Sequence, residues 1–269
     1  MYEAYWGLKE KPFENTPDPR FLYHSEESAD VFTRLLYALN SNRGAAMLTG
    51  DSGCGKTLMA RALVQSLNPE NTEVAMLPNP SWSPDDFLRE ILYQLGEDSP
   101  LETRSQVVHR LHEVLYENYQ AGKETLVLID EGQLIEDPAV FEEIRLVLNF
   151  QLNDAFLITL LLVGQPALAK QVQAYAPLDQ RIATRGVLRP FAEEEVYEYI
   201  THRLRVAGRQ EPVFSADAVE LIYQYSDGIP RKINNICDIS LVIGFSRKLE
   251  SMDAGWIQRL IQAESGNGA

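Results

Sequence analysis

The sequence predicts an α/β fold in which a parallel sheet lies between layers of helices and is followed by a small all-helical domain. Short, continuous apolar runs recur along residues 45–188, with helical segments between them. Strands of this kind, buried on both faces, are typical of parallel sheets. After Pro190 the apolar runs stop, and only stretches with helical periodicity follow.

The predicted elements alternate along the chain. Helical spacing begins after Ser25, which can serve as an N-cap, and the first apolar run covers residues 45–49. Further strands are expected at 73–77, 126–129, 155–163 and 186–188. Helices are expected between them at 56–67, 84–95, 103–121 and 137–150, and in the C-terminal part at 192–207, 215–225, 231–247 and 253–264.

These elements suggest three parts. Residues 1–24 form an arm, residues 25–191 an αβα core, and residues 192–269 a helical lid. The arm has no clear periodicity but contains aromatic residues such as Trp6 and Phe13. Because exposing these side chains to water is unfavourable, we expect the arm to pack against the rest of the protein.

The composition limits the class of protein. The 269 residues are 45% hydrophobic and carry a formal charge of −15. The apolar content is sufficient for a core, and the acidic balance argues against a protein that coats DNA by charge alone. Cys54 and Cys237 cannot form a disulfide framework or a four-cysteine zinc site. No apolar run reaches 18 residues and no signal peptide is evident, so we expect a cytoplasmic protein with no integral membrane segment.

The strongest motif is the loop at residues 50–57, which fits Gly-x-x-x-x-Gly-Lys-[Ser/Thr]. Backbone N–H groups of such a loop bind phosphate oxygens, and the start of the following helix adds its positive dipole end. Lys56 is expected to reach the β- and γ-phosphates, and Thr57 to bind Mg²⁺. The predicted nucleotide-binding positions of this loop are Gly50, Asp51, Ser52, Gly53, Cys54, Gly55, Lys56, Thr57 and Leu58.

Two adjacent carboxylates, Asp130 and Glu131, follow the apolar run at 126–129. Ligands of open α/β sheets bind at this end of the strands. We expect Asp130 to hold Mg²⁺ and Glu131 to polarise the attacking water of a hydrolysis reaction. Taken alone, the pair also fits a helix N-cap, but the upstream phosphate loop favours the catalytic interpretation.

Gln165 ends the next apolar run. At this position a polar side chain would lie beside the γ-phosphate and orient the attacking water, so Gln165 is a candidate sensor residue. The alternative is a residue that merely starts a helix, since Pro166 is well suited to the first helical position.

Arg181 and Arg185 are four residues apart, a spacing that puts both on one face of a short helix. An arginine from a neighbouring subunit stabilises the transition state of phosphoryl transfer. Both residues are therefore candidates for this role, with Arg181 favoured, although surface ion pairing is an alternative in so acidic a protein.

Arg231 begins a predicted helix of the C-terminal domain, within a Gly-Ile-Pro-Arg segment. We expect it to contact the γ-phosphate of the nucleotide. The alternative is a solvated arginine in the first turn, where helix dipoles disfavour cations unless an anion is bound nearby.

In this order, the phosphate loop, the Asp-Glu pair, the arginine pair and Arg231 resemble the AAA+ ATPases. Within them, segments 7–13, 16–23, 143–150, 163–166 and 228–231 look like the general secretion pathway protein A (ExeA) family. The resemblance covers nearly the whole chain. It implies a P-loop NTPase core, a helical lid, ATP and Mg²⁺ as ligands, and a ring or partial ring of subunits with active sites between them.

The chain departs from this family at three points. Leu58 stands where a second threonine is usual, and Gly132 where alanine often follows the Asp-Glu pair. ExeA itself continues into a membrane span and a peptidoglycan-binding domain, whereas this sequence stops after the predicted lid. Binding to the cell wall is therefore not carried over.

Three functions fit these observations. The first is an ATPase that hydrolyses ATP at a subunit interface to drive or regulate assembly of a bacterial envelope machine, such as a secretion channel, a pilus or a polysaccharide exporter. A protein partner would then recruit it to the inner membrane face. The second is an ATP-dependent DNA-associated factor resembling transposition helpers, which the charge of −15 opposes. The third is a nucleotide-binding switch with little turnover, which Glu131 argues against.

Overall fold

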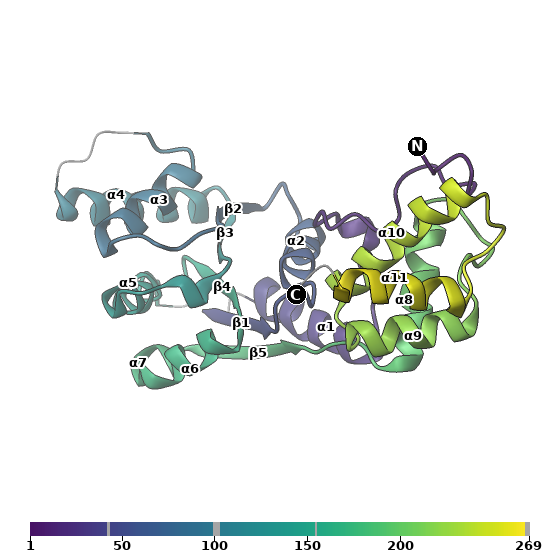
Figure 1. Ribbon diagram of the computed structural model, residues 1–269. Coiled ribbons are helices and arrows are strands. Elements are labelled where there is room, and N and C mark those ends of the chain that lie inside the picture. Colours follow the sequence, from purple (N-terminus) through teal and green to yellow (C-terminus); the bar gives the residue numbers. More distant parts are fainter. Residues whose placement is uncertain (42–43, 99–102, 154, 267–269) are drawn as a thin grey trace. The chain divides into compact units, whose positions relative to one another are not determined.

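Figure 1 shows the computed structural model, in which the chain divides into two compact units. The sheet unit comprises Glu27–Ser52 and Lys56–Leu188, and the helical unit comprises Met1–Glu26, Gly53–Gly55 and Arg189–Ala269. The N-terminal arm therefore belongs with the C-terminal helices. The structure describes residues 1–41, 44–98, 103–153 and 155–266.

The sheet unit contains five parallel strands in the order β2-β3-β4-β1-β5. This arrangement confirms the predicted fold class. Because β4 lies between β1 and β3, the carboxyl ends of these three strands meet at one edge of the sheet. The strands are Ala45–Gly50 (β1), Thr72–Leu77 (β2), Glu124–Ile129 (β3), Thr159–Gly164 (β4) and Ile182–Leu188 (β5).

Helices cover both faces of this sheet (Figure 1). Met47 and Val127 point into a core formed with helices α3 to α7. On the other face, Val31 and Leu35 of α1 lie against Gly186 of β5. Every residue of β1 and β4 is buried, as expected for central strands of a parallel sheet. The helices of this layer system are Glu26–Asn40 (α1), Lys56–Ser66 (α2), Pro84–Gln94 (α3), Arg104–Gln120 (α4), Gly132–Leu134 (η2), Pro138–Val147 (α5), Pro166–Ala174 (α6) and Ala176–Asp179 (α7).

Two strands differ in extent from the prediction. β5 begins at Ile182, four residues before the predicted start, because the polar residues of this edge strand interrupt its apolar pattern. β4 begins at Thr159, and the predicted residues before it include Phe156, which forms an isolated antiparallel bridge with Gln151.

The helical unit contains the four predicted C-terminal helices, each within two residues of its expected bounds. None of the helices within the described ranges is long and apolar enough to cross a membrane. The elements are Pro19–Phe21 (η1), Glu193–Val206 (α8), Ala216–Ser226 (α9), Pro230–Arg247 (α10) and Ala254–Gly266 (α11).

The N-terminal arm packs into the core of the helical unit, as its aromatic residues predict. Trp6 and Phe13 are almost fully buried there. The indole N–H of Trp6 donates to the carbonyl of Leu241 in α10 at 2.9 Å, and the backbone N–H of Lys9 donates to the carbonyl of Ala207 at 2.8 Å. The arm is thus held by both apolar burial and hydrogen bonds.

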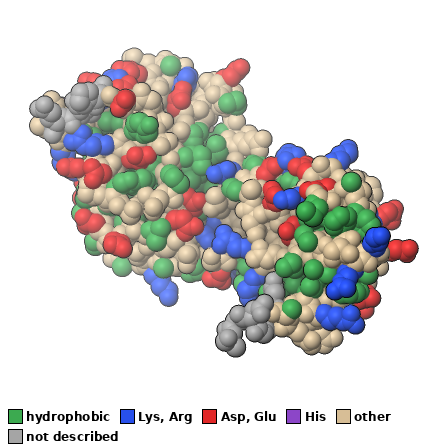
Figure 2. All heavy atoms as spheres, turned by 45° about the horizontal axis from the view of Figure 1, so that its top comes forward, with side chains coloured by type: hydrophobic (Ala, Val, Ile, Leu, Met, Phe, Trp, Pro, Cys, Tyr) green, Lys and Arg blue, Asp and Glu red, His purple; other side chains and the backbone are tan. Residues whose placement is uncertain are grey.

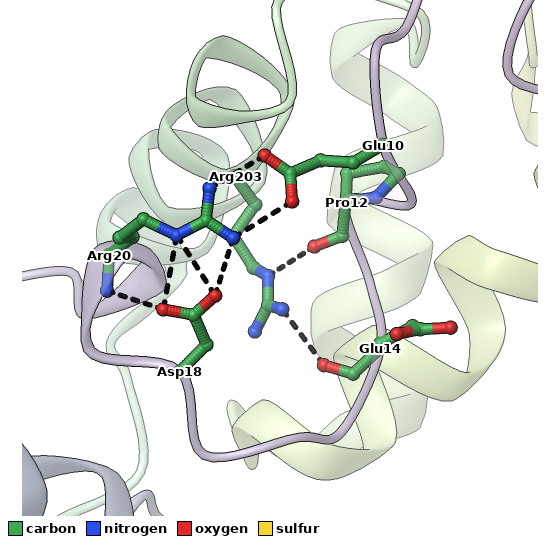
Figure 3. A network of polar contacts seen from close by, with 6 residues as sticks. All are labelled: Glu10, Pro12, Glu14, Asp18, Arg20 and Arg203. Atoms are coloured by element: carbon green, nitrogen blue, oxygen red, sulfur yellow. Dashed lines mark hydrogen bonds and ion pairs between the residues drawn. The ribbon is translucent and has the colours of Figure 1, made fainter.

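Arg203 of α8 binds the backbone of the arm at Pro12 and Glu14 (Figure 3). Its guanidinium is buried and donates to the backbone carbonyls of Pro12 and Glu14, the latter at 2.9 Å. It also donates to the hydroxyl of Tyr199 at 3.0 Å and lies 4.7 Å from the ring centre of Phe21. Because burial raises the pKa of Tyr199, its hydroxyl stays neutral in this network. The buried charge of Arg203 needs these carbonyl acceptors, and the arm carbonyls need its N–H donors. The packing of the arm and of α8 is therefore coupled.

We expect Arg203→Met to lower the free energy of unfolding by about 2–3 kcal/mol, because it leaves two arm carbonyls and the Tyr199 hydroxyl without their donor. Arg205→Met, on the exposed side of the same helix, is the matched control and should change it by less than about 0.5 kcal/mol. Urea unfolding followed by tryptophan fluorescence measures both. Equal effects of the two substitutions would contradict the assigned role of Arg203.

Candidate nucleotide-binding site

The phosphate loop follows β1, and α2 begins directly after it at Lys56. The backbone of Gly53 has φ +86°, in the left-handed region that favours glycine. A Cβ atom there would lie 2.9 Å from Cβ of Arg231, so a side chain would not fit. The loop thus keeps bare backbone where a phosphate would approach, and α2 adds the unpaired N–H groups of its first turn.

Lys56 is oriented by the loop that precedes it. Its side chain is only 6% exposed, and its ammonium group donates to the carbonyl of Asp51 at 3.0 Å. This contact folds the lysine back over the loop, where a phosphate group bound by the loop would meet its charge.

Thr57 and Asp130 meet across the carboxyl edge of the sheet. The Thr57 hydroxyl donates to Oδ2 of Asp130 at 2.7 Å, and Oδ1 accepts from the backbone N–H of Glu131 at 2.8 Å. The pair presents two oxygen ligands of the kind that Mg²⁺ prefers, with nucleotide phosphates and water as its other partners. The described residues contain no cluster of three or more His, Cys, Asp or Glu side chains for an all-protein metal site.

Glu131 has a left-handed backbone, with φ 52° and ψ 35°. This conformation is uncommon for a non-glycine residue, and such strain is often found at functional sites. Glu131 lies directly after Asp130, so its carboxylate is presented at the same edge of the sheet as the phosphate loop.

Gln165 follows β4 and is the N-cap residue of α6. Both of its predicted features, the strand end and the helix start, are therefore present. Its backbone N–H donates to the side-chain carbonyl of Gln133 at 2.8 Å. The side-chain amide of Gln133 in turn donates to Oε2 of Glu131. Gln133 was not predictable from the sequence, because a single glutamine after a glycine matches no motif.

The predicted short helix that carries both Arg181 and Arg185 is wrong. Arg181 lies in a turn after α7, and Arg185 is in β5. Arg181 donates to the carbonyl of Leu148 at 3.2 Å and to the side chain of Asn149 at 2.5 Å. Arg185 forms an ion pair with Asp179 at 2.7 Å. Arg185 is an exposed residue of this edge strand and Arg181 lies just before it, so the four-residue spacing reflects a turn followed by extended backbone and not a helix.

Arg231 occupies the first turn of α10 in the helical unit. Its backbone N–H donates to the carbonyl of Gly53 at 3.3 Å, and the residue is exposed. Gly53 and Arg231 belong to the same compact unit, so this contact lies within the helical unit.

Comparison with known proteins identifies relatives. Residues 39–172 match the family model described as AAA domain. The chain is 37% identical over 251 residues to General secretion pathway protein A of Aeromonas hydrophila, an alignment covering 92% of this chain but only 45% of that protein. It is 22% identical to the uncharacterized HTH-type transcriptional regulator MJ0774 of Methanocaldococcus jannaschii, covering 91% of this chain and 70% of that protein.

Solved structures share the fold at low sequence identity. The ORC2 protein of Aeropyrum pernix, in its ADPNP-ADP complexes, matches with a TM-score of 0.71 and 19% identity, covering 94% of this chain and 71% of that one. The RuvB Holliday junction branch migration motor of Thermotoga maritima matches with a TM-score of 0.62 and 18% identity, covering 91% and 73%. At these identities the likeness establishes the architecture alone.

We expect Lys56→Ala to weaken the binding of a non-hydrolysable ATP analogue about 10- to 100-fold, because it removes a charge-assisted hydrogen bond to phosphate. Arg61→Ala removes a cation from the exposed side of the same helix and should leave the affinity unchanged. Isothermal titration calorimetry measures both, with circular dichroism as a check on folding. An unaltered affinity of a folded Lys56→Ala protein would contradict the predicted phosphate contact.

Proposed function

Because the chain is an AAA+ ATPase related to General secretion pathway protein A, we propose that it binds and hydrolyses ATP between subunits and thereby drives or regulates the assembly of a bacterial envelope machine. The observation that carries the hydrolytic part is the Thr57–Asp130 hydrogen bond, with Glu131 as the next residue. It brings a phosphate loop, a pair of Mg²⁺ ligands and a carboxylate to one edge of the sheet.

Each of these residues has a separate role in the proposed hydrolysis of ATP. The loop amides and Lys56 bind the phosphates, and Thr57 and Asp130 hold Mg²⁺, which neutralises charge on the phosphate oxygens when it is bound. Glu131 accepts a hydrogen bond from the attacking water and orients it toward the γ-phosphate. Gln165, at the end of the neighbouring strand β4, contacts the same water or the γ-phosphate.

The position of Arg181 supports a site completed by a second subunit. β5 runs beside β1, with Ile182 opposite Ala45 and Leu188 opposite Gly50. Because a strand rises about 3.3 Å per residue, Ile182 lies about 17 Å from the end of β1, and Arg181 is one residue further away. Arg181 is at this far end and binds groups that follow α5. Arg181 is therefore distant from the phosphate loop of its own subunit, which supports a role at the site of a neighbour.

Arg185 remains the second candidate for this role. Its side chain is 39% exposed, and it pairs with Asp179, which also precedes β5. An exposed ion pair of this kind is worth little, so a nucleotide of a neighbouring subunit competes with Asp179 at small cost.

Arg231 is proposed to contact the nucleotide from the helical unit. Its backbone is hydrogen-bonded to the loop residue Gly53, and its exposed side chain lies in the first turn of α10. An anion near that turn removes the unfavourable interaction between a cation and the positive end of the helix dipole.

Sequence similarity supports the envelope role. Over a similar share of this chain, the sequence identity to General secretion pathway protein A is 37%, whereas the identity to the ORC2 and RuvB structures is 19% and 18%. On the face drawn in Figure 2, Lys and Arg side chains lie among Asp and Glu side chains. With a net charge of −15, this pattern favours a protein partner at the inner membrane face over the DNA alternative.

We expect turnover per subunit to rise with protein concentration, because a neighbour completes each site. Arg181→Ala and Lys56→Ala should each be inactive alone, yet their mixture should regain about a quarter of the wild-type rate. In the mixture, an Arg181→Ala subunit keeps its own phosphate loop and receives the arginine of a Lys56→Ala neighbour. A steady-state phosphate-release assay measures the rates.

The same mixing experiment with Arg185→Ala decides between the two arginines. If neither mixture recovers activity while the wild type turns over at a rate independent of concentration, the interface proposal is wrong. Arg89→Ala, which removes a cation from another helix of the sheet unit, is the control and should behave as the wild type in the mixture.

We expect Glu131→Gln to bind ATP normally but to hydrolyse it at least ~100-fold more slowly, because an amide cannot accept the proton of the attacking water. The variant should therefore stay in its ATP-bound state and retain its partner. Affinity purification from native cells, followed by mass spectrometry, should recover envelope secretion, pilus or polysaccharide-export proteins in excess over Lys56→Ala. Recovery of only DNA-bound proteins, released by nuclease, would overturn the envelope role.

A further inference from the structure

We infer that Gln133 is a positioning residue for Glu131, fixing the catalytic carboxylate relative to the start of α6. The inference rests on the proposed hydrolysis of ATP and adds a residue to that site. Gln133 lies in η2, two residues after Glu131, and is held between the ends of β3 and β4.

Both ends of the Gln133 side-chain amide are engaged. The NH₂ group donates to Oε2 of Glu131, and the carbonyl Oε1 accepts from the backbone N–H of Gln165 at 2.8 Å. A carboxylate only accepts and a backbone N–H only donates, so a single orientation of the amide satisfies both partners. Gln133 therefore connects the two residues that we assign to the attacking water.

Neighbouring residues of β4 and α6 leave little room for the Gln133 side-chain amide to move. A Cβ atom on Gly164, the last residue of β4, would lie 2.7 Å from Oε1 of Gln133. Glycine at the end of β4 therefore leaves the space that the Gln133 side-chain amide occupies. The Gln171 side chain of α6 donates to the carbonyl oxygens of Gln133 and Ile135, at 3.4 and 3.3 Å, which holds the η2 turn against this helix.

This arrangement has a chemical consequence for Glu131. The amide occupies one carboxylate oxygen and leaves the other for water. A neutral amide donor fixes the orientation of the carboxylate without placing a second charge beside it. Orientation of this kind is valuable because small displacements of a catalytic group cost large factors in rate. The Gln133 bond therefore acts on the chemical step and not on nucleotide binding.

Two substitutions separate this role from a structural one. Gln133→Glu keeps an acceptor for the Gln165 N–H but, at mildly alkaline pH, has no donor for Glu131. Gln133→Leu removes both hydrogen bonds. The control, Gln173→Leu, makes the same chemical change on the exposed side of α6.

We expect kcat to fall about 10-fold or more in both Gln133 variants, with KM for ATP and the affinity for a non-hydrolysable analogue unchanged within twofold. Gln173→Leu should match the wild type. Gln133→Glu keeps the shape of glutamine and the hydrogen bond from the Gln165 N–H, so this variant decides the question even where Gln133→Leu folds poorly.

A wild-type kcat in Gln133→Glu would overturn the positioning role of Gln133 but not the proposed function. A loss of kcat in the Gln133 variants that is matched by an equal loss of nucleotide affinity would do the same. Absence of turnover in the wild type at every protein concentration would contradict the proposed function, and the positioning role with it. The two failures are therefore distinguished by the wild-type measurement.

Discussion

The hydrogen bond between Thr57 and Asp130 is the contact on which the geometry of the site depends. It joins the first turn of α2, which follows β1, to the residue that follows β3, although β4 lies between these strands in the sheet. After β1 the chain crosses to the far edge of the sheet at β2, returns through β3 and β4 to the side of β1, and then adds β5 on the other side of β1. Such a reversal of strand order leaves space outside the carboxyl ends of the strands, where open α/β sheets bind their ligands. The remaining elements keep these ends in place.

Burial of the sheet on both faces makes this edge rigid. The central strands are short and fully buried, so a shift of one residue would disturb core packing or leave ladder hydrogen bonds unmade. Rigid strand ends can in turn support a strained residue. The left-handed backbone of Glu131 is held by the bond from its own N–H to Asp130 and by the amide of Gln133 on its side chain. The strained backbone of Glu131 is maintained because these two hydrogen bonds offset its cost.

The fold was predictable from the sequence because its strong signals are local. Continuous apolar runs, the loop glycines and the Asp-Glu pair each act within a few residues, and the structure places them on the expected elements. The extent of the edge strand β5 was underestimated, since Thr184 and Arg185 interrupt its apolar run. In addition, Arg185 and the preceding turn residue Arg181 happen to match helical spacing. Gln133 and Arg203 were missed for another reason. Gln165, the second partner of Gln133, and the arm carbonyls bound by Arg203 are distant in sequence, and only the folded chain brings them together.

Under the proposed function, the charge of the subunit explains why assembly and nucleotide binding should be coupled. Subunits that each carry −15 repel one another, and a bound nucleotide adds further negative charge. The phosphate loop supplies Lys56, whereas Arg181 is held at the opposite end of the sheet. A neighbour's arginine at the phosphates would replace repulsion by attraction only while the nucleotide is present.

Because coupling free energies are reciprocal, ATP would then stabilise the assembly by the same factor by which assembly strengthens ATP binding. Hydrolysis and phosphate release would remove that stabilisation, which is the property required of a protein that times the assembly of a larger machine.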